Sequence, residues 1–458
     1  MIRIFNLYVP TRLLVLLGGE IVAICASFWL AIRIRFGDAS DITFYDEHVL
    51  WKIAAVAALA LICSHYLELY DWQHLTKPSE TYSRILMLLG IVCLLLAGLI
   101  YVFPRFSVGR GVFLIGICIL SITWMSWRWA YARLISFPLM RERVYLVGQG
   151  ERARRIAEAI RTRGELGMDM SGWAGETATE SLTRDSLGEI LLETAKKHAV
   201  QRVIVALDDR RSRMPVQELL ELRMRGVLVE DGATLLEKIS GQIEVDTLRP
   251  SALIFSDGFH LRPKHWLIRD FVSTILALTL SIITLPLIPI IVLLIKLTSP
   301  GPVLYRQKRV GFRNKVFNCY KFRTMRADAE ADSGPTWALD DDPRVTKIGR
   351  FLRMTRLDEI PQLWNVLRGD MEFVGPRPER PEFIEQLSEQ IPYYRLRHVV
   401  RPGITGWAQI NYKYGNSVRD SKEKLKYDLF YIKNMSLGLD FWIVFATIKT
   451  VLFRDGSL

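Results

Sequence analysis

Two adjacent carboxylates stand out in the stretch RLDEIPQLWN, which runs from Arg356 to Asn365. Pro361 suits the first turn of a helix, because its missing N–H costs nothing there. Asp358 and Glu359 would then lie at the positive end of the helix dipole, which keeps carboxylates ionised and attracts phosphoryl groups. The stretch therefore predicts a phosphate-handling site. The same helix would place three large side chains on one face: Leu363, Trp364 and Leu367.

An acidic pair at the start of a helix is by itself ordinary capping. What argues for chemistry is an ordered series of motifs on both sides of the pair: SPGPVLYRQKRVG (299–311), YKFRTM (320–325), DDPRVTKIGRFLR (341–353), GDMEFVGPRPERPEF (369–383) and RPGITGWAQINY (401–412). Together these motifs resemble the bacterial sugar transferases, the monotopic polyprenyl-phosphate hexose-1-phosphate transferases. Members of this family are phosphoglycosyl transferases that start lipid-linked glycan assembly.

The resemblance implies a covalent mechanism. Asp358 would attack the β-phosphorus of a UDP-sugar, releasing UMP and forming an aspartyl phosphosugar. Undecaprenyl phosphate would then accept the sugar phosphate, which initiates an exopolysaccharide or a related glycan. Glu359 is expected to assist through the metal or through proton handling. The sequence does not specify the sugar; glucose or galactose is suggested only by large family members.

Cationic side chains in the motifs are candidates to hold the phosphate oxygens, because guanidinium groups bind such oxygens in pairs. The candidates are Lys321, Arg323, Arg356, Arg377 and Arg401. Prolines around Arg377 and Arg401 restrict the backbone and would hold these two side chains in place. Gly403 and Gln409 are predicted to line the nucleotide or sugar pocket.

Mg²⁺ is the expected cofactor, with Asp358 and Glu359 as its protein ligands. The other available ligands are phosphate oxygens of the substrate, and the sequence has no histidine or cysteine cluster.

The N-terminal part predicts a multi-pass membrane protein, since 50% of the 458 residues are hydrophobic. Four apolar segments each have the length of a membrane span: Arg12–Ile34, Leu50–Leu69, Ile85–Phe103 and Gly111–Tyr131. They predict a transmembrane four-helix bundle within residues 1–140. Glu20, inside the first segment, is expected to find a polar partner.

Charge indicates orientation and partners. Arginines follow the fourth span, so the positive-inside rule places the chain after Arg133 in the cytoplasm and the protein in the bacterial inner membrane. The formal net charge of +12 fits membrane lipids and phosphate ligands, and no nucleic-acid partner is expected. The five cysteines form no CxxC pair, as is typical of a reducing compartment.

Residues 141–261 predict a Rossmann-like α/β module. A strand at Val144–Val147 leads through Gly148 and Gly150 into a helix, and further strands are expected at Arg202–Leu207 and Val227–Val229. No strand clearly ends in an acidic residue about twenty positions past the glycines, where a ribose-binding carboxylate belongs. We therefore expect the glycines to serve the tight turn, with nucleotide binding as the less favoured alternative.

An apolar segment from Trp266 to Leu297 contains Pro286 and Pro289, which remove helical hydrogen bonds and predict a break. We expect residues 262–298 to form a re-entrant helix that keeps an α-rich catalytic domain, residues 299–458, on the cytoplasmic side. Ser281 and Thr284 are expected to bond the freed carbonyls. A single span, with the domain outside the cell, is the competing topology. C-terminal amphipathic helices complete the predicted domain.

Two other functions are compatible with parts of the sequence. The first is a membrane-attached NAD-dependent sugar-nucleotide dehydratase or epimerase using Gly148 and Gly150, but it would need a Tyr-x-x-x-Lys pair that cannot be placed here. The second is a non-catalytic scaffold for polysaccharide export, which would release no UMP. Oligomeric state stays open, with a homodimer through the membrane helices or the middle module as one arrangement.

Overall fold

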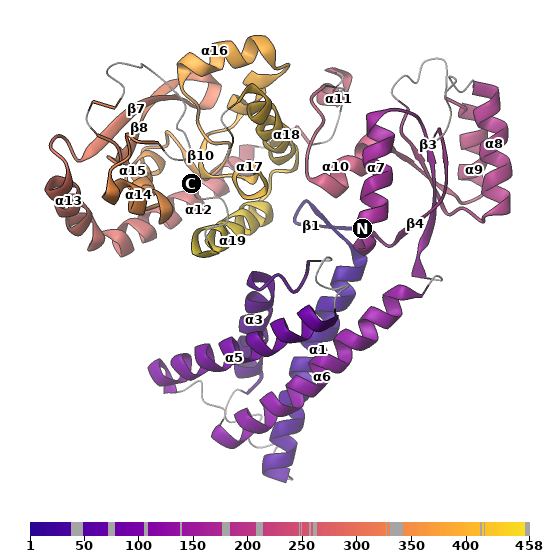
Figure 1. The fold of residues 1–458 in the computed structure, drawn as a ribbon, viewed down its shortest axis with the longest axis horizontal. Helices are drawn as coiled ribbons and strands as arrows, with labels where there is room; N and C mark the ends of the chain where they lie inside the picture. The colour runs from indigo at the N-terminus through magenta and orange to yellow at the C-terminus, as the bar shows by residue number, and fades with distance from the viewer. Residues whose placement is uncertain are drawn as a thin grey trace. The chain divides into compact units, whose positions relative to one another are not determined.

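The computed structural model describes residues 1–37, 49–71, 78–104, 109–137, 140–175, 184–207, 214–246, 248, 250–255, 258–259, 263–326, 328–329, 342–412, 415 and 417–453. These residues form two compact units (Figure 1). The first unit contains Met1–Arg3 and Tyr8–Leu235, and the second contains Ile4–Leu7 and Leu236–Leu458. A short hairpin of β1 (Ile2–Ile4) and β2 (Leu7–Val9) begins the chain.

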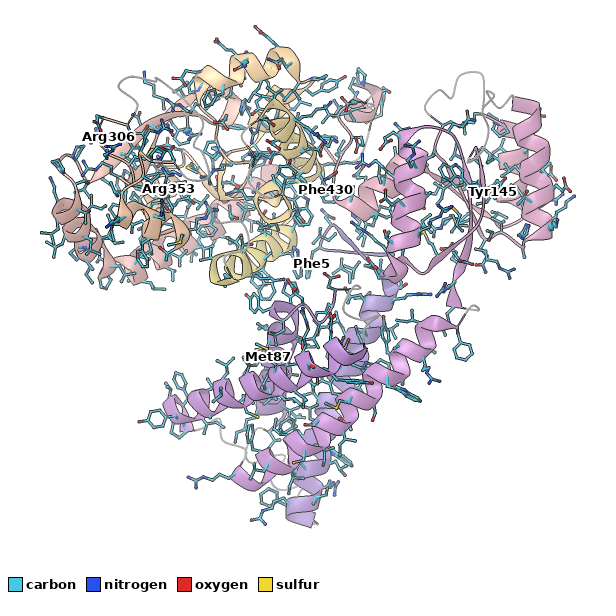
Figure 2. The ribbon with its side chains drawn as sticks, in the orientation of Figure 1. Phe5, Met87, Tyr145, Arg306, Arg353 and Phe430 are labelled. Atoms are coloured by element: carbon cyan, nitrogen blue, oxygen red, sulfur yellow. The ribbon has the colours of Figure 1, made fainter. Side chains whose placement is uncertain are left out.

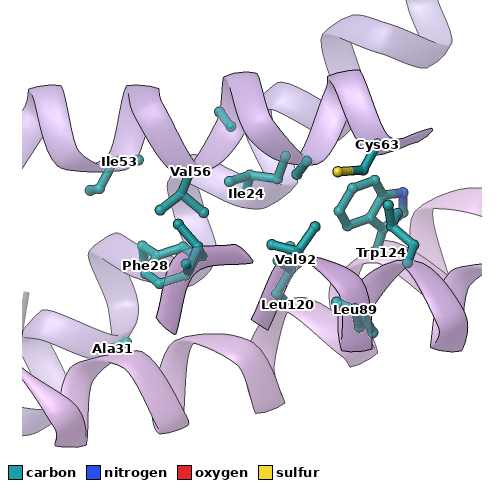
Figure 3. Packing of buried hydrophobic residues seen from close by; sticks show 14 of the residues in the cluster. Ile24, Phe28, Ala31, Ile53, Val56, Cys63, Leu89, Val92, Leu120 and Trp124 are labelled. Atoms are coloured by element: carbon teal, nitrogen blue, oxygen red, sulfur yellow. The ribbon is translucent and has the colours of Figure 1, made fainter. Parts of the chain in front are cut away.

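The first unit opens with helices at the predicted spans: α1 (Thr11–Phe36), α3 (Val49–Tyr66), α5 (Pro78–Val102) and α6 (Arg110–Ser136). Helix α1 packs on α3 and α6, and α5 packs on the same two helices. Figure 3 shows their shared core, in which Val92 lies between Phe28 and Trp124. Within the described residues, five helices, these four and α12 of the second unit, are long and apolar enough to cross a membrane.

A buried ion pair lies among these helices. Glu20 is fully buried, and its carboxylate is 2.5 Å from a guanidinium nitrogen of Arg128. Tyr70 and Trp124 donate hydrogen bonds of 2.7 and 2.9 Å to the same carboxylate. The expectation of a polar partner for Glu20 is confirmed.

A parallel sheet follows the membrane-length helices, with strand order β4-β3-β5-β6. Its strands are β3 (Glu142–Val147), β4 (Met168–Ala174), β5 (Arg202–Val205) and β6 (Leu228–Asp231). Its helices are α7 (Glu151–Thr162), η4 (Gly164–Leu166), α8 (Arg184–Lys197), α9 (Val216–Met224) and α10 (Gly232–Ser240). Three strands were expected from sequence, and β4 was missed because its polar and half-buried residues show no apolar run.

The turn between β3 and α7 is held by a hydrogen bond from the neighbouring strand β4. Trp173 of β4 donates a 2.8 Å hydrogen bond to the carbonyl of Gly148. Strand β4 ends in Ala174, and Gly175 is the last described residue before residue 184. That the glycines serve the tight turn alone stays a prediction.

The second unit contains the interrupted apolar segment as two helices, α12 (Pro263–Thr284) and α13 (Leu287–Thr298), and Figure 1 shows α13 turning away from the axis of α12. The break falls at Leu285–Pro286. Pro289 lies inside the first turn of α13, where its missing N–H is tolerated. The prediction that Pro289 forms part of the break is therefore wrong. Ser281 and Thr284 each donate a 2.7 Å hydrogen bond to a carbonyl four residues earlier.

The remaining helices of this unit are short apart from the last two: α11 (Pro250–Phe255), η5 (Phe312–Asn314), α14 (Lys347–Met354), η6 (Leu357–Glu359), α15 (Gln362–Leu367), α16 (Pro381–Gln390), η7 (Tyr394–Val399), α17 (Trp407–Asn411), α18 (Val418–Asn434) and α19 (Leu437–Phe453). Strands β7 (Leu304–Val310) and β8 (Val316–Phe322) form an antiparallel hairpin, and β9 (Glu372–Val374) pairs in parallel with β10 (Gly403–Thr405). The main core lies around α18, where Leu425, Leu429 and Phe430 are almost fully buried.

Candidate active site

The acidic pair lies in η6, a single 3₁₀ turn directly before α15. Asp358 and Glu359 are both buried. The chain enters the turn at Arg356, whose φ of +56° is in the left-handed region that non-glycine residues rarely adopt. The pair therefore precedes the helix N-terminus as predicted. Trp364 corrects one detail, because it is 58% exposed while Leu363 is buried; a helix as short as α15 buries only one narrow side.

Glu359 is surrounded by cations from three separate segments. Its Oε1 accepts hydrogen bonds of 2.9 Å from both Lys321 of β8 and Arg377, in the loop after β9, and lies 4.0 Å from Nη1 of Arg356. Burial alone would raise the pKa of Glu359, but Lys321, Arg377 and Arg356 outweigh it and hold this pKa well below its usual range. Glu359 is therefore ionised at neutral pH.

The pKa of Asp358 shifts in the opposite direction. Its Oδ1 is buried and has no hydrogen-bond partner. Burial raises the pKa of Asp358, and the attraction of Lys321 only partly opposes this rise. Two neighbouring carboxyl groups whose environments push their pKa values apart are a recurrent arrangement in active sites. Of the two, Asp358 is the one with an oxygen that no neighbouring side chain occupies.

Asn365 explains why Lys321 reaches the pair. Asn365 is fully buried, accepts a 3.1 Å hydrogen bond from the backbone N–H of Tyr320, and donates a 2.7 Å hydrogen bond to the carbonyl of Asn318. These bonds fasten α15 to β8. Sequence reasoning did not assign Asn365 a role; its signal was an amide between the apolar residues Trp364 and Val366.

Two predicted phosphate ligands lie elsewhere. Arg323 is 5% exposed and donates hydrogen bonds of 2.8 to 2.9 Å to the carbonyls of Ser299 and Pro300. It fastens the end of α13 to the hairpin, and its predicted phosphate contact stays a prediction. Arg401 pairs with Asp270 of α12, and its guanidinium lies over the ring of Trp266.

Gly403 supports the loop that carries Arg377. Its N–H donates a 3.0 Å hydrogen bond to the carbonyl of Pro376, and a Cβ placed on it would lie 2.1 Å from the nitrogen of Gly375. Only glycine fits this close approach. Gln409 donates to the carbonyl of Ile404, while its Oε1 is buried without a hydrogen-bond partner. Neither contact tests the predicted pocket-lining role, which stays a prediction.

A buried ionic network behind this loop was missed by sequence reasoning. Arg269 of α12 is 4% exposed; its guanidinium lies 2.6 Å from Glu372 and 2.7 Å from Asp440, and it donates a 3.2 Å hydrogen bond to the carbonyl of Val374. Tyr431 accepts a further bond of 2.6 Å from Arg269. Since Glu372 and Val374 bound β9, Arg269 holds the strand from which the Arg377 loop emerges.

We expect the stability of the protein to depend on pH through Glu372. Burial raises its pKa to about 7 from 4.5, although Arg269 opposes the rise. The folded state thus binds more protons than the unfolded state between these values, so stability falls as the pH rises through this window. Between these pH values, the free energy of unfolding of the wild type should fall by about 3 kcal/mol relative to that of Glu372→Gln. Thermal midpoints in detergent between pH 4.5 and 8 measure the difference.

The control for this prediction is Glu382→Gln, at a carboxylate whose side chain is 52% exposed. Its midpoint should follow that of the wild type at every pH. If the Glu372→Gln curve also ran parallel to the wild type, the raised pKa of Glu372 would be wrong.

The site as a whole has the parts that enzymes use on phosphate groups. A carboxylate oxygen stands unoccupied at Asp358, and lysine and arginine side chains converge on its neighbour Glu359. In the same unit, Arg353, labelled in Figure 2, donates a 2.9 Å hydrogen bond to Thr324 and braces α14 against the end of β8. The class defined by this site and by the membrane-length helices is that of a membrane-associated enzyme acting on phosphorylated substrates.

Comparison with known proteins identifies the family. A family model described as bacterial sugar transferase matches residues 264–454. The chain is 33% identical over 322 residues to a UDP-glucose:undecaprenyl-phosphate glucose-1-phosphate transferase of Klebsiella pneumoniae, covering 67% of each protein. It is 29% identical over 490 residues to the protein of the same name from Xanthomonas campestris pv. campestris, covering 98% of this chain and 96% of that one. The chain belongs to the bacterial sugar transferase family.

A third relative widens the range of sugars. The chain is 43% identical over 223 residues to UDP-N-acetylgalactosamine-undecaprenyl-phosphate N-acetylgalactosaminephosphotransferase of Aeromonas hydrophila. This match covers 48% of this chain and 51%, about half, of that relative. The names of these three relatives share undecaprenyl phosphate as one substrate and differ in the sugar.

Proposed function

We propose that this protein transfers a sugar 1-phosphate from a UDP-sugar to undecaprenyl phosphate and thereby initiates an exopolysaccharide or a related glycan. The observation that carries the proposal is the buried, unpartnered Oδ1 of Asp358 beside a carboxylate held by Lys321 and Arg377. The names of the relatives support the two substrates.

The reaction would proceed in two displacements. In the first, an oxygen of Asp358 forms a bond to the β-phosphorus, and the bond from that phosphorus to the bridging oxygen breaks, so that UMP leaves with the electron pair. In the second, an oxygen of undecaprenyl phosphate attacks the same phosphorus, and the carboxylate is released. Lys321, Arg356 and Arg377 would neutralise the charge that develops on the phosphate oxygens. Ping-pong kinetics would follow.

We propose Mg²⁺ as the cofactor. Within the described residues no three His, Cys, Asp or Glu side chains are grouped to hold a metal. This fits Mg²⁺, which commonly takes one or two carboxylates together with substrate phosphates and waters. The unpartnered oxygen of Asp358 and the carboxylate of Glu359 are the candidate ligands. When bound, the ion would neutralise negative charge on the diphosphate.

A re-entrant topology is part of the proposal. Both arms of the broken helix pack on the same small domain: Ala277 of α12 lies in one cluster with Leu363, and Ile291 of α13 lies in another with Leu352. Ile360, next to the acidic pair, borders both clusters. A single straight span would carry its far end away from a domain at its near end. The packing supports a helix that enters and leaves on the cytoplasmic side.

Topology can be tested by labelling in intact cells. In a variant whose five native cysteines are replaced by alanine, Arg326→Cys should resist a membrane-impermeant thiol reagent, because the domain faces the cytoplasm. Arg110→Cys, at the start of α6, should be labelled as the matched control. Labelling at position 326 before permeabilisation would favour a spanning helix.

The function is tested with the purified full-length protein, undecaprenyl phosphate, Mg²⁺ and a panel of UDP-sugars. We expect release of UMP with at least one sugar, together with a lipid-linked sugar diphosphate. A scaffold would release none with any sugar, and that result would overturn the proposal.

A further inference from the structure

A cavity of about 470 Å³ opens in the first unit, between the start of α1, the start of β3 and the edge formed by β4 and α7. Three arginines from separate segments line it: Arg12, Arg141 and Arg161. The only acidic residue in its lining is Asp169. With three positive charges against one negative in its lining, the cavity has the charge that favours an anion.

Arg12 is held in place at the base of this cavity. Its guanidinium donates hydrogen bonds of 3.0 Å to the carbonyl of Gly164 and 2.7 Å to that of Met140. A Cβ on Gly167, whose φ is +70°, would lie 2.7 Å from Nε of Arg12, so a side chain at this position would disturb the arginine. The position of Arg12 is therefore determined by the backbone around it, before any ligand arrives.

Two of the three cavity arginines, Arg12 and Arg141, lie close to one another. Arg141 is close enough to Arg12 to act on it as a like charge. Within the described parts of the chain, no carboxylate forms a salt bridge with Arg12 or Arg141. Two like charges brought together without an acidic partner favour a bound anion, and guanidinium groups match phosphate oxygens in geometry.

The cavity lies beside the ends of two membrane-length helices. Arg12 is the second residue of a membrane-length helix, Thr11–Phe36, and α6 ends at Ser136, shortly before Arg141. Tyr131 donates a 2.8 Å hydrogen bond to the carbonyl of Arg12, and its ring lies near Trp127, a pairing typical of the membrane interface. Basic pockets at the cytoplasmic ends of membrane helices are known to bind anionic lipid headgroups.

We propose that this cavity binds the phosphate group of an anionic phospholipid headgroup. The same chemistry would accept free phosphate, but a lipid reaches the cavity from the adjoining bilayer and is present there at high local concentration. Such a lipid would connect the end of α6 to the α/β part of the first unit. The inference does not depend on the proposed catalytic function.

The test uses the full-length protein in phosphatidylcholine nanodiscs with a varied fraction of phosphatidylglycerol, and native mass spectrometry counts the retained lipid. Arg141→Gln and Arg161→Gln leave the hydrogen bonds of Arg12 intact, and each should weaken phosphatidylglycerol retention about fivefold. Asp169→Asn should strengthen retention, because it removes the only negative charge. Arg154→Gln on the same helix α7, with a side chain 74% exposed, should change nothing.

Three outcomes would overturn the proposal. One is equal loss of lipid in Arg154→Gln and in Arg141→Gln, which would indicate a general surface charge effect. Another is unchanged retention in the double variant Arg141→Gln/Arg161→Gln with an unaltered thermal midpoint. The third is displacement of the lipid by millimolar inorganic phosphate, which would assign the cavity to a soluble phosphate.

Discussion

Asp358→Asn is expected to abolish UMP release, with a loss of at least about 1,000-fold in turnover. The substitution keeps the shape of the side chain in its buried position but removes the charged oxygen that would attack phosphorus. Because Oδ1 of Asp358 makes no hydrogen bond in the folded protein, the change should leave the thermal midpoint nearly unaltered. UMP release from the sugar that the wild type uses measures the first effect, and thermal unfolding measures the second.

A matched control is Asp370→Asn, a partly exposed carboxylate of the same unit that bonds Arg368 and Asn365. It should retain most of the activity. Mass spectrometry of the wild type, quenched with donor but no acceptor, should find the mass of a sugar phosphate on the peptide that contains Asp358. Full turnover by Asp358→Asn, or product without such an adduct, would remove Asp358 from the nucleophile role.

Arg269→Met is expected to destabilise the second unit by about 3–5 kcal/mol, because it leaves buried carboxylates without a counter-charge. Glu372 and Asp440 both pair with this one guanidinium, which also supports the carbonyl of Val374. The strand before the Arg377 loop should loosen, so activity should fall together with stability. The thermal midpoint and UMP release of the same preparation test both effects.

Rescue distinguishes charge burial from simple loss of packing. The triple variant Arg269→Met/Glu372→Gln/Asp440→Asn has no unpaired buried charges in this network. Its thermal midpoint should therefore be higher than that of Arg269→Met alone. Arg368→Met is the control, since its pairing with Asp370 is on the surface and contributes at most about 1 kcal/mol. An Arg269→Met variant as stable as Arg368→Met would show that the network does not stabilise the fold.

Much of the architecture followed from local patterns. Apolar runs of membrane length correspond to α1, α3, α5 and α6, because a helix of that length and composition can be recognised from one segment alone. The break at Pro286 follows from the missing N–H of proline. Strand β4 was not predicted, because its burial comes from neighbouring strands and helices and not from its own apolar residues.

The partners of each charged group were decided by packing. The sequence offered three of the basic motif residues equally as phosphate ligands: Lys321, Arg323 and Arg401. Of these three, only Lys321 contacts Glu359. Arg323 instead holds the backbone at Ser299 and Pro300, and Arg401 pairs with Asp270. The same limit explains why the Arg269 network was missed, since its members come from α12, β9, α18 and α19.

The sequence by itself determined the kinds of groups present: a carboxylate pair before a helix, basic motifs around it, and apolar segments long enough for a membrane. Only the tertiary structure decided that Glu359 takes the cations while an oxygen of Asp358 stays unpartnered. The physical reason is that the interacting groups are close in space but far apart in the sequence. Spacing along one helix or strand sets which neighbours share a face, whereas ion pairs and burial depend on contacts such as those of Asn365 between segments far apart in the chain.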